Sequence, residues 1–182
     1  NEIIKTQIRS KLVKVNKNID LKCLKKINNS YFKTEGNKEN LSFIIEIVKK
    51  LKIKKNELVR TLKKFKGLKY RQQIIYKSKN LTIINDSKAT SYSSSISILK
   101  SLSNVYWIIG GLAKKGDKFL LSKKECKTFK AYIFGKNKNV FIKDLRNVMN
   151  CEKFTNLRLL IYKILKKLKK EKNKKNKTIL FS

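Results

Sequence analysis

The fold is decided by the stretch Val105-Tyr106-Trp107-Ile108-Ile109-Gly110-Gly111, a continuous apolar run that stops at two glycines. A short apolar run bounded by a turn signal is typical of a strand that is buried on both faces of a parallel sheet. Residues 131–134 repeat the pattern and stop at Gly135, and Thr178-Ile179-Leu180-Phe181 is a third segment typical of a buried strand. The sequence therefore predicts a mostly parallel sheet.

Helical patterns lie between these strands. Residues 93–102 and 156–168 predict two helices, and the second helix has six apolar side chains on one face: Leu157, Leu160, Ile161, Ile164, Leu165 and Leu168. Two further strands are predicted at residues 73–76 and 81–84, joined by a Lys-Ser-Lys-Asn turn. Strands that alternate with helices indicate an α/β fold.

The first third of the sequence has a different pattern. Short strands and turns are expected in residues 1–35, around Ile3-Ile4, Leu12-Val13 and Leu21. A helix is predicted from Asn40, with one apolar face formed by Leu41, Ile44, Ile45, Val48 and Leu51. A second helix is predicted near Asn56, with Leu58, Leu62 and Phe65 on its apolar face, and its end coincides with Gly67. We therefore predict two domains, residues 1–66 and 67–182.

The formal net charge of +35 raises the question of a nucleic-acid partner. Only five of the 47 basic residues are arginine, the lysines are spread along the chain, and Asn and Ile are abundant as well. Lys, Asn and Ile are the residues that AT-rich codons encode, whereas nucleic-acid binders lean on Arg for bidentate contacts. We therefore expect biased composition and no nucleic-acid partner. The alternative is a basic nucleic-acid-binding module that uses the lysine-rich run 163–177.

Cysteine and histidine usage bounds the chemistry. Cys23, Cys126 and Cys151 are an odd number at wide spacings, and the chain has no histidine. This pattern argues against a zinc site or a disulfide framework and favours a reducing, cytoplasmic location. No apolar run approaches the roughly 18 residues of a membrane-spanning helix, so no membrane partner is expected.

Polar segments follow the predicted strands. Asn85-Asp86-Ser87-Lys88-Ala89-Thr90 and Gly110-Gly111-Leu112-Ala113-Lys114-Lys115-Gly116-Asp117 each come directly after a strand, and Tyr70-Arg71 lies just past the domain boundary. In α/β sheets ligands bind beyond the carboxyl ends of the strands. Lysine and arginine there suit carboxylates or phosphates. The alternatives are a helix cap at Asp86 or Ser87, an ordinary loop at the glycines, and a surface arginine.

Taken together, these segments resemble the Mur ligases. The resemblance covers residues 37–182 and includes an N-x-x-N motif, Asn37-Lys38-Glu39-Asn40. The sequence N-D-S-K-A-T is the form of the branch that adds D-glutamate. The chain departs from the family pattern at Tyr70 and Gly36, where the family usually has histidine, and it lacks the family's P-loop. We interpret the chain, which starts at Asn1, as a C-terminal fragment.

The resemblance implies a Rossmann-like C-terminal Mur ligase domain at 67–182, and at 1–66 the end of the central ATPase domain. It implies a cytoplasmic monomer that uses ATP and Mg²⁺ to join D-glutamate to UDP-N-acetylmuramoyl-L-alanine through an acyl phosphate, with the Mg²⁺ ligands in the missing N-terminal part. By resemblance, substrate contacts come from Lys88, Thr90 and Lys114. Nucleotide contacts come from Asn37, Asn40, Arg71 and Asp86. No catalytic residue is expected in this fragment.

Overall fold

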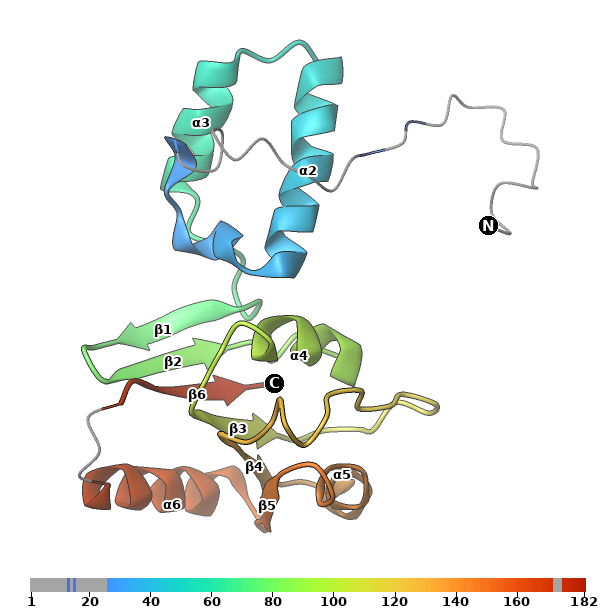
Figure 1. Ribbon diagram of the computed structural model, residues 1–182, viewed down its shortest axis with the longest axis vertical. Coiled ribbons are helices and arrows are strands. Elements are labelled where there is room, and N and C mark those ends of the chain that lie inside the picture. Colours follow the sequence, from blue (N-terminus) through green and yellow to red (C-terminus); the bar gives the residue numbers. More distant parts are fainter. Residues whose placement is uncertain (1–12, 14, 16–25, 172–174) are drawn as a thin grey trace. The chain divides into compact units, whose positions relative to one another are not determined.

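The computed structural model describes residues 13, 15, 26–171 and 175–182 (Figure 1). The chain divides into two compact units, Asn1–Phe65 and Lys66–Ser182. Most of the short strands expected within residues 1–35 lie outside the described residues. Within the described part of that segment, the prediction of strands is wrong at Ser30–Lys33, which form a 3-10 helix, η2.

Two helices follow η2 in the first unit. Helix α2 spans Glu35–Lys50 and α3 spans Lys55–Lys64. Helix α2 begins five residues before the predicted start at Asn40, because its first turn carries no apolar periodicity that a sequence pattern could detect. The buried apolar side chains described in this unit form one small cluster: Ile27, Phe32, Leu41 and Leu62.

The predicted apolar face of α2 is too wide. Leu41 is fully buried, but Ile44 is 37% exposed and Leu51 is 66% exposed. The 3-10 helix η2 packs against α2, and Leu41 is the α2 residue that enters the buried cluster with Phe32 of η2. Ile44 and Leu51 therefore fit the helical periodicity, but they are not buried like Leu41.

The second unit is an α/β sheet. Six strands lie in the order β1-β2-β6-β3-β4-β5, with β1 antiparallel to β2 and every other neighbouring pair parallel. The strands are β1 Gln73–Lys77, β2 Leu81–Asn85, β3 Val105–Ile109, β4 Phe129–Ile133, β5 Asn150–Lys153 and β6 Lys177–Phe181. The helices are α4 Tyr92–Leu99, α5 Lys138–Leu145 and α6 Leu157–Lys170. The predicted mostly parallel α/β fold is confirmed.

Alternate residues of the buried strands face two different cores. Val105, Trp107 and Ile109 of β3 join the cluster that contains residues of α4 and α5. Tyr106 and Ile108 join the cluster on the other face, which contains residues of α6. Figure 1 shows α6 on one side of the sheet and α4 on the other. A strand that is buried on both faces needs apolar residues at every position, which is why residues 105–109 form an unbroken apolar run.

The sequence patterns missed α5 and β5 and overestimated the buried face of α6. Helix α5 has eight residues and β5 has four, none fully buried, so neither produces a recognisable period. In α6, Leu160 and Ile164 are buried as predicted, but Ile161 and Leu165 are 41% and 44% exposed. A single helix on a sheet buries only the narrow stripe that points at the strands.

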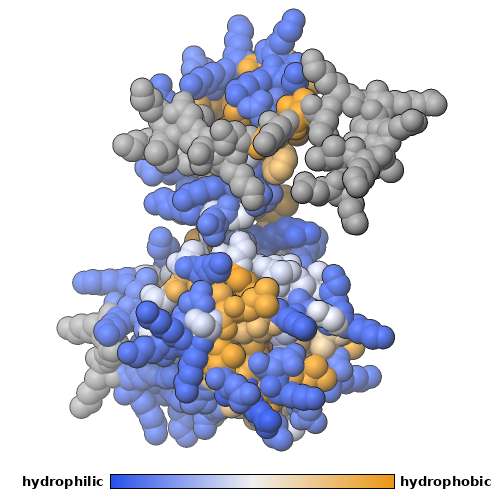
Figure 2. Space-filling model, turned by 45° about the vertical axis from the view of Figure 1, so that its right-hand side comes forward, coloured by the Kyte–Doolittle hydropathy of each residue, from blue (hydrophilic) through white to orange (hydrophobic). Residues whose placement is uncertain are grey.

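The face of the molecule drawn in Figure 2 is mostly hydrophilic. Figure 2 shows apolar side chains gathered on one part of the second unit, among hydrophilic ones. The large apolar residues of this unit that are exposed include Ile74, Ile75, Tyr76, Leu112, Leu120, Ile161, Tyr162 and Leu165. Among the described residues, no helix combines the length and the hydropathy that a membrane crossing requires.

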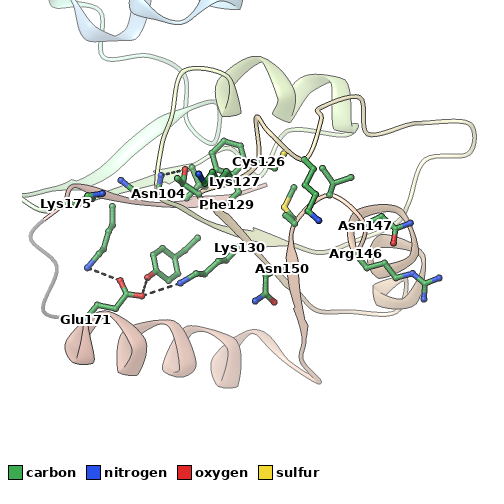
Figure 3. A pocket seen from close by; sticks show the side chains of 17 residues that line it. Asn104, Cys126, Lys127, Phe129, Lys130, Arg146, Asn147, Asn150, Glu171 and Lys175 are labelled. Atoms are coloured by element: carbon green, nitrogen blue, oxygen red, sulfur yellow. Dashed lines mark hydrogen bonds and ion pairs between the residues drawn. The ribbon is translucent and has the colours of Figure 1, made fainter.

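Glu171, at the end of α6, connects that helix to three strands. Its carboxylate accepts a hydrogen bond of 2.5 Å from the hydroxyl of Tyr106 in β3. The same carboxylate lies 3.1 Å from Nζ of Lys177 in β6 and 3.5 Å from Nζ of Lys130 in β4 (Figure 3). Lys177 is buried, so removing the carboxylate would leave a desolvated ammonium group without this partner.

The pKa of Glu171 lies below the ordinary value of 4.5. Burial alone would raise this pKa, but the Tyr106 hydroxyl and the charges of Lys177 and Lys130 lower it by more. A carboxyl group with a depressed pKa in the folded state stabilises the fold above its unfolded-state pKa. That stabilisation is lost as the pH falls through the folded-state pKa, which here lies below pH 4.5.

We expect Glu171→Gln to lower the free energy of unfolding of the second unit by about 1–2 kcal/mol at neutral pH. The dependence of that free energy on pH below the ordinary glutamate pKa should become flatter. Denaturant unfolding followed by the fluorescence of Trp107, the only tryptophan of the chain, measures both effects. The control for the loss of stability at neutral pH is Glu125→Gln, which removes the same charge from an exposed loop where the carboxylate bonds to Ser122. Equal losses in the two variants would contradict the role of Glu171.

Candidate functional site

A cavity of about 270 Å³ lies at the carboxyl ends of β3 and β6, beside the N-terminus of α4. Most of its lining comes from the segment after β2, the first turn of α4, and the glycine loop after β3. The lining residues are Ser87, Ala89, Thr90, Ser91, Tyr92, Ser95, Trp107, Ile109, Gly110, Gly111, Leu112, Lys114, Asp117, Phe141 and Ser182. The parallel order of the strands brings these distant segments to one edge of the sheet.

Two of the three predicted substrate residues line this cavity. Thr90 follows β2 and Lys114 follows β3, and both are exposed, so a hydroxyl group and an ammonium group can reach the same ligand. Lys88 does not line the cavity. Its backbone N–H donates to the carbonyl of Tyr70 at 3.1 Å and its side chain is exposed, so its contact with substrate stays a prediction.

The cavity also contains a small buried hydrogen-bond network that sequence reasoning missed. Nε1 of Trp107 donates to Oγ of Ser182 at 2.7 Å, and the hydroxyl of Ser95 donates to the same oxygen at 3.1 Å. Trp107 is 1% exposed and Ser95 is 4% exposed. The available signal was a single tryptophan inside an apolar strand, since a buried indole N–H needs an acceptor. The network joins β3, α4 and the end of β6.

The glycine loop takes its path for steric reasons. A Cβ atom on Gly110 would lie 2.4 Å from Cε1 of Phe134, and Gly111 has a φ of +97°. A side chain at the first glycine would displace the Phe134 ring, and one at the second would strain the backbone. Further along the loop, the N–H of Ala113 donates to Oδ1 of Asn137 at 3.3 Å. These contacts direct the chain toward the cavity before it reaches Lys114.

Asp86 is buried beneath the loop that precedes β1. Its Oδ1 accepts a hydrogen bond of 2.9 Å from the N–H of Gln72, and its own N–H donates to the carbonyl of Phe181 at 2.7 Å. Burial raises the pKa of this carboxyl group above 3.8, while the N–H of Gln72 and the charge of Arg71 oppose the increase. Asp86 therefore holds the chain around Arg71, and its predicted contact with a nucleotide ribose stays a prediction.

The turn that carries Arg71 has a strained backbone on both sides of the arginine. Tyr70 has a φ of 65° and Gln72 a φ of 47°, a left-handed conformation that non-glycine residues rarely adopt. The N–H of Gln72 is held by Asp86 and the carbonyl of Tyr70 by Lys88. Arg71 is exposed, which leaves its guanidinium group accessible to a ligand.

The chain was compared with protein-family models, curated proteins and solved structures. No protein-family model matches the chain. The chain is 34% identical over 122 residues to a UDP-N-acetylmuramoylalanine--D-glutamate ligase from Wolbachia sp. subsp. Brugia malayi, which covers 67% of this chain and 24% of that protein. It is 36% identical over 124 residues to the protein of the same name from Francisella philomiragia, which covers 64% of this chain and 30% of that protein.

The chain belongs to the Mur ligase family. It spans about a quarter of the length of the curated relatives it matches. Solved Mur ligases share its fold. MurC from Thermotoga maritima has a TM-score of 0.58 at 14% identity, and MurF from Acinetobacter baumannii has a TM-score of 0.62 at 13% identity. Each comparison covers 81% of this chain and 34% of the solved one.

The N-x-x-N residues of this Mur ligase chain lie in the first unit, on the first turns of α2. Asn37 is buried, and its side-chain amide donates to the carbonyl of Tyr31 at 2.7 Å. Asn40 is exposed. The hydrogen bond from Asn37 therefore holds η2 against α2. The nucleotide contacts of Asn37 and Asn40 stay predictions.

A larger cavity of about 1140 Å³ lies at the opposite edge of the sheet, where the parallel strands begin (Figure 3). Six of its 17 lining residues are basic: Lys123, Lys127, Lys130, Arg146, Lys175 and Lys177. Lysine and arginine make up 47 of the 182 residues of the chain, so this share is close to what the composition alone supplies. In the smaller cavity, Lys114 is the one basic residue among 15. The lining of the smaller cavity therefore has a lower share of basic residues than the chain as a whole.

We expect Asp86→Asn and Asp86→Ala to differ in stability. Asparagine keeps an oxygen that can accept from Gln72 and removes a desolvated charge, so the free energy of unfolding at neutral pH should be unchanged or higher. Alanine leaves the Gln72 N–H without this acceptor and should cost about 1–2 kcal/mol. Because the pKa of Asp86 is raised in the folded state, its ionisation destabilises the fold as the pH rises above 3.8, and both variants should lose this effect.

Denaturant unfolding of the two Asp86 variants at several pH values checks this prediction. Equal destabilisation by asparagine and alanine would show that the charge of Asp86, and not its acceptor oxygen, holds the turn around Arg71.

Proposed function

We propose that this chain is part of an ATP-dependent ligase that adds D-glutamate to UDP-N-acetylmuramoyl-L-alanine during peptidoglycan synthesis. In this proposal, the unit Lys66–Ser182 is the C-terminal Mur ligase domain and the unit Asn1–Phe65 is the end of the central ATP-binding domain. The observation that carries the proposal is that Thr90 and Lys114, from two separate family motifs, line one cavity. The names of the relatives supply the amino acid and the acceptor.

The dimensions and chemistry of the cavity suit an amino acid. Its volume of about 270 Å³ lies below the roughly 300–1,000 Å³ of sites for drug-sized ligands. Trp107, Ile109 and Phe141 offer apolar surface for methylene groups, while Thr90 and Lys114 offer donors for carboxylates. The lining contains one lysine although lysine is abundant in the chain. This difference supports the view that the residues of the lining are retained to bind a particular ligand.

The reaction proceeds by activation and attack. ATP phosphorylates the carboxylate of UDP-N-acetylmuramoyl-L-alanine, the amine of D-glutamate attacks the acyl carbon, and phosphate leaves from the tetrahedral intermediate. In this scheme Lys114 and Thr90 hold the carboxylates of D-glutamate so that its amine faces the acyl phosphate, which is catalysis by positioning. Arg71 serves the phosphates of the nucleotide, and the nucleotide contacts of Asp86, Asn37 and Asn40 are proposed on the resemblance alone.

The proposal assigns Mg²⁺ no ligand in this chain. Within the described residues, no group of three or more His, Cys, Asp or Glu side chains is placed to hold a metal ion. Mg²⁺ would neutralise charge on the phosphates of ATP when it is bound. A ligase that uses ATP and a UDP-linked precursor works in the cytoplasm, which is the location we propose.

Titration of the isotope-labelled chain with D-glutamate tests the proposal directly. We expect chemical-shift changes at Thr90, at Lys114 and in the glycine loop, and much smaller changes with L-glutamate. Shifts that are equal for both enantiomers, or that occur only at exposed lysines away from the cavity, would contradict it. The 182 residues contain no P-loop, so we also expect this chain by itself to release no phosphate from ATP in the presence of both substrates.

A pair of neighbouring lysines tests the division of the site. Lys114 lines the cavity and Lys115 does not, although both are exposed. In an active polypeptide that contains this chain, Lys114→Ala should raise the KM for D-glutamate by about 10- to 100-fold, because a charge-assisted hydrogen bond contributes roughly 1.5–3 kcal/mol. The KM for ATP should change little, and Lys115→Ala should resemble the parent enzyme.

Arg71→Ala should show the opposite pattern, with the loss in the KM for ATP and in kcat. Steady-state kinetics with each substrate varied in turn separates the two patterns. Equal effects of the Lys114 and Arg71 variants on both substrates would contradict this division.

A further inference from the structure

Asp117 connects two segments of the cavity that are 25 residues apart. It lies at the end of the glycine loop, and its Oδ2 accepts a hydrogen bond of 2.5 Å from the N–H of Tyr92. Tyr92 is the first residue of α4 and follows Thr90 by two positions. The N–H of Asp117 donates to the carbonyl of Lys114 at 3.2 Å. One residue thus contacts both the segment that carries Thr90 and the turn that carries Lys114.

The interaction with α4 is favourable for two reasons. The first N–H groups of a helix have no partner within the helix, so the carboxylate satisfies one of them. The positive end of the helix dipole also favours a negative charge at this point. The residue that normally caps this helix, Ser91, accepts from Ser94, which leaves the N–H of Tyr92 to Asp117.

Two polar contacts hold the backbone of the glycine loop on either side of Lys114. The residues between β3 and β4 form turns without a regular helix or strand, and Gly111 and Gly116 have positive φ angles. The N–H of Ala113 is held by Asn137 on one side of Lys114, and Asp117 holds the other side. Phe119, two residues after Asp117, also packs against Tyr92 and Trp107, and Asn137 and Asp117 supply the polar contacts on either side of Lys114.

We propose that Asp117 is a positioning residue that couples the Thr90 segment to the Lys114 loop, so that both donors reach one amino-acid ligand. This inference deepens the proposed function and rests on it for the identity of the ligand. The geometric part of the inference does not depend on the ligand. When Asp117 is removed, the start of α4 and the loop at residues 113–117 lose protection together.

Hydrogen exchange of the 182-residue chain tests the coupling without any substrate. Asp117→Ala should speed exchange at the N–H groups of Tyr92 and Ala113 by about tenfold or more, and Asp117→Asn should retain part of the protection because its amide oxygen can still accept. Asp144→Ala is the matched control, because Asp144 accepts from the hydroxyl of Tyr92 at 3.2 Å and not from its backbone N–H. Faster exchange at Tyr92 alone would reduce Asp117 to a helix cap and overturn the coupling.

Kinetics in an active polypeptide that contains the chain tests the consequence for the ligand. Asp117→Ala should raise the KM for D-glutamate about tenfold, with the KM for ATP little changed and with partial rescue by Asp117→Asn. Glu125→Ala removes a carboxylate from the following exposed loop and should leave both KM values unchanged. If Asp117→Ala changes both KM values equally, the positioning role is wrong. If the parent polypeptide joins no D-glutamate, the proposed function fails, while the exchange experiment still decides the coupling.

Discussion

The insertion of β6 between β2 and β3 is the constraint on which the second unit depends. Strand β6 is parallel to both neighbours and pairs with them over nearly its whole length. Ser182, just past its end, lines the cavity and accepts from Trp107, and the carbonyl of Phe181 accepts from the N–H of Asp86. The segments that contain Asp86 and Trp107 come much earlier in the sequence than β6, and contacts with the end of β6 hold both of them in place.

Burial limits where lysine is tolerated, and the lining of the smaller cavity contains a single lysine although lysine is abundant in the chain. A lysine on an exposed helix face has little effect on stability, so biased composition can accumulate there. A lysine that is buried needs a carboxylate, as Lys177 needs Glu171. Within the smaller cavity, Trp107, Ser95 and Ser182 satisfy one another, and a charged side chain in any of their places would leave a polar group without a partner.

Much of the second unit could be predicted from the sequence because its strongest signals are local. The run at residues 105–109 is apolar throughout because both faces of β3 are buried, and β6 is also buried along most of its length, with apolar residues from Ile179 to Phe181. Strand β5 and helix α5 were missed because they are short and only partly buried. Ile161 and Leu165 of α6 were predicted to be buried but are exposed. Periodicity identifies the apolar face of a helix, but it does not show how much of that face the sheet covers.

The candidate site could be predicted only in part, because some of its residues line the cavity while others bond to the backbone around it. Thr90 and Lys114 present exposed donors to the cavity, and their types alone suggest carboxylate binding. Asn37 and Asp86 are buried and bond to backbone groups, and their expected contacts with a nucleotide stay predictions. A sequence motif records that a residue type is needed at a position, and it does not distinguish a contact with ligand from a contact with the backbone that places the ligand's partner.

That distinction has a physical basis in this fold. A loop at the carboxyl edge of a parallel sheet has no ladder hydrogen bonds of its own, so its polar side chains must supply them. Asp86 does this for the turn around Arg71, and Asp117 does it for the start of α4. A carboxylate suits both positions because it accepts strongly from backbone N–H groups and cannot donate. The exposed cations of the site, Arg71 and Lys114, are thus each held in place by a nearby acid that need not touch the ligand.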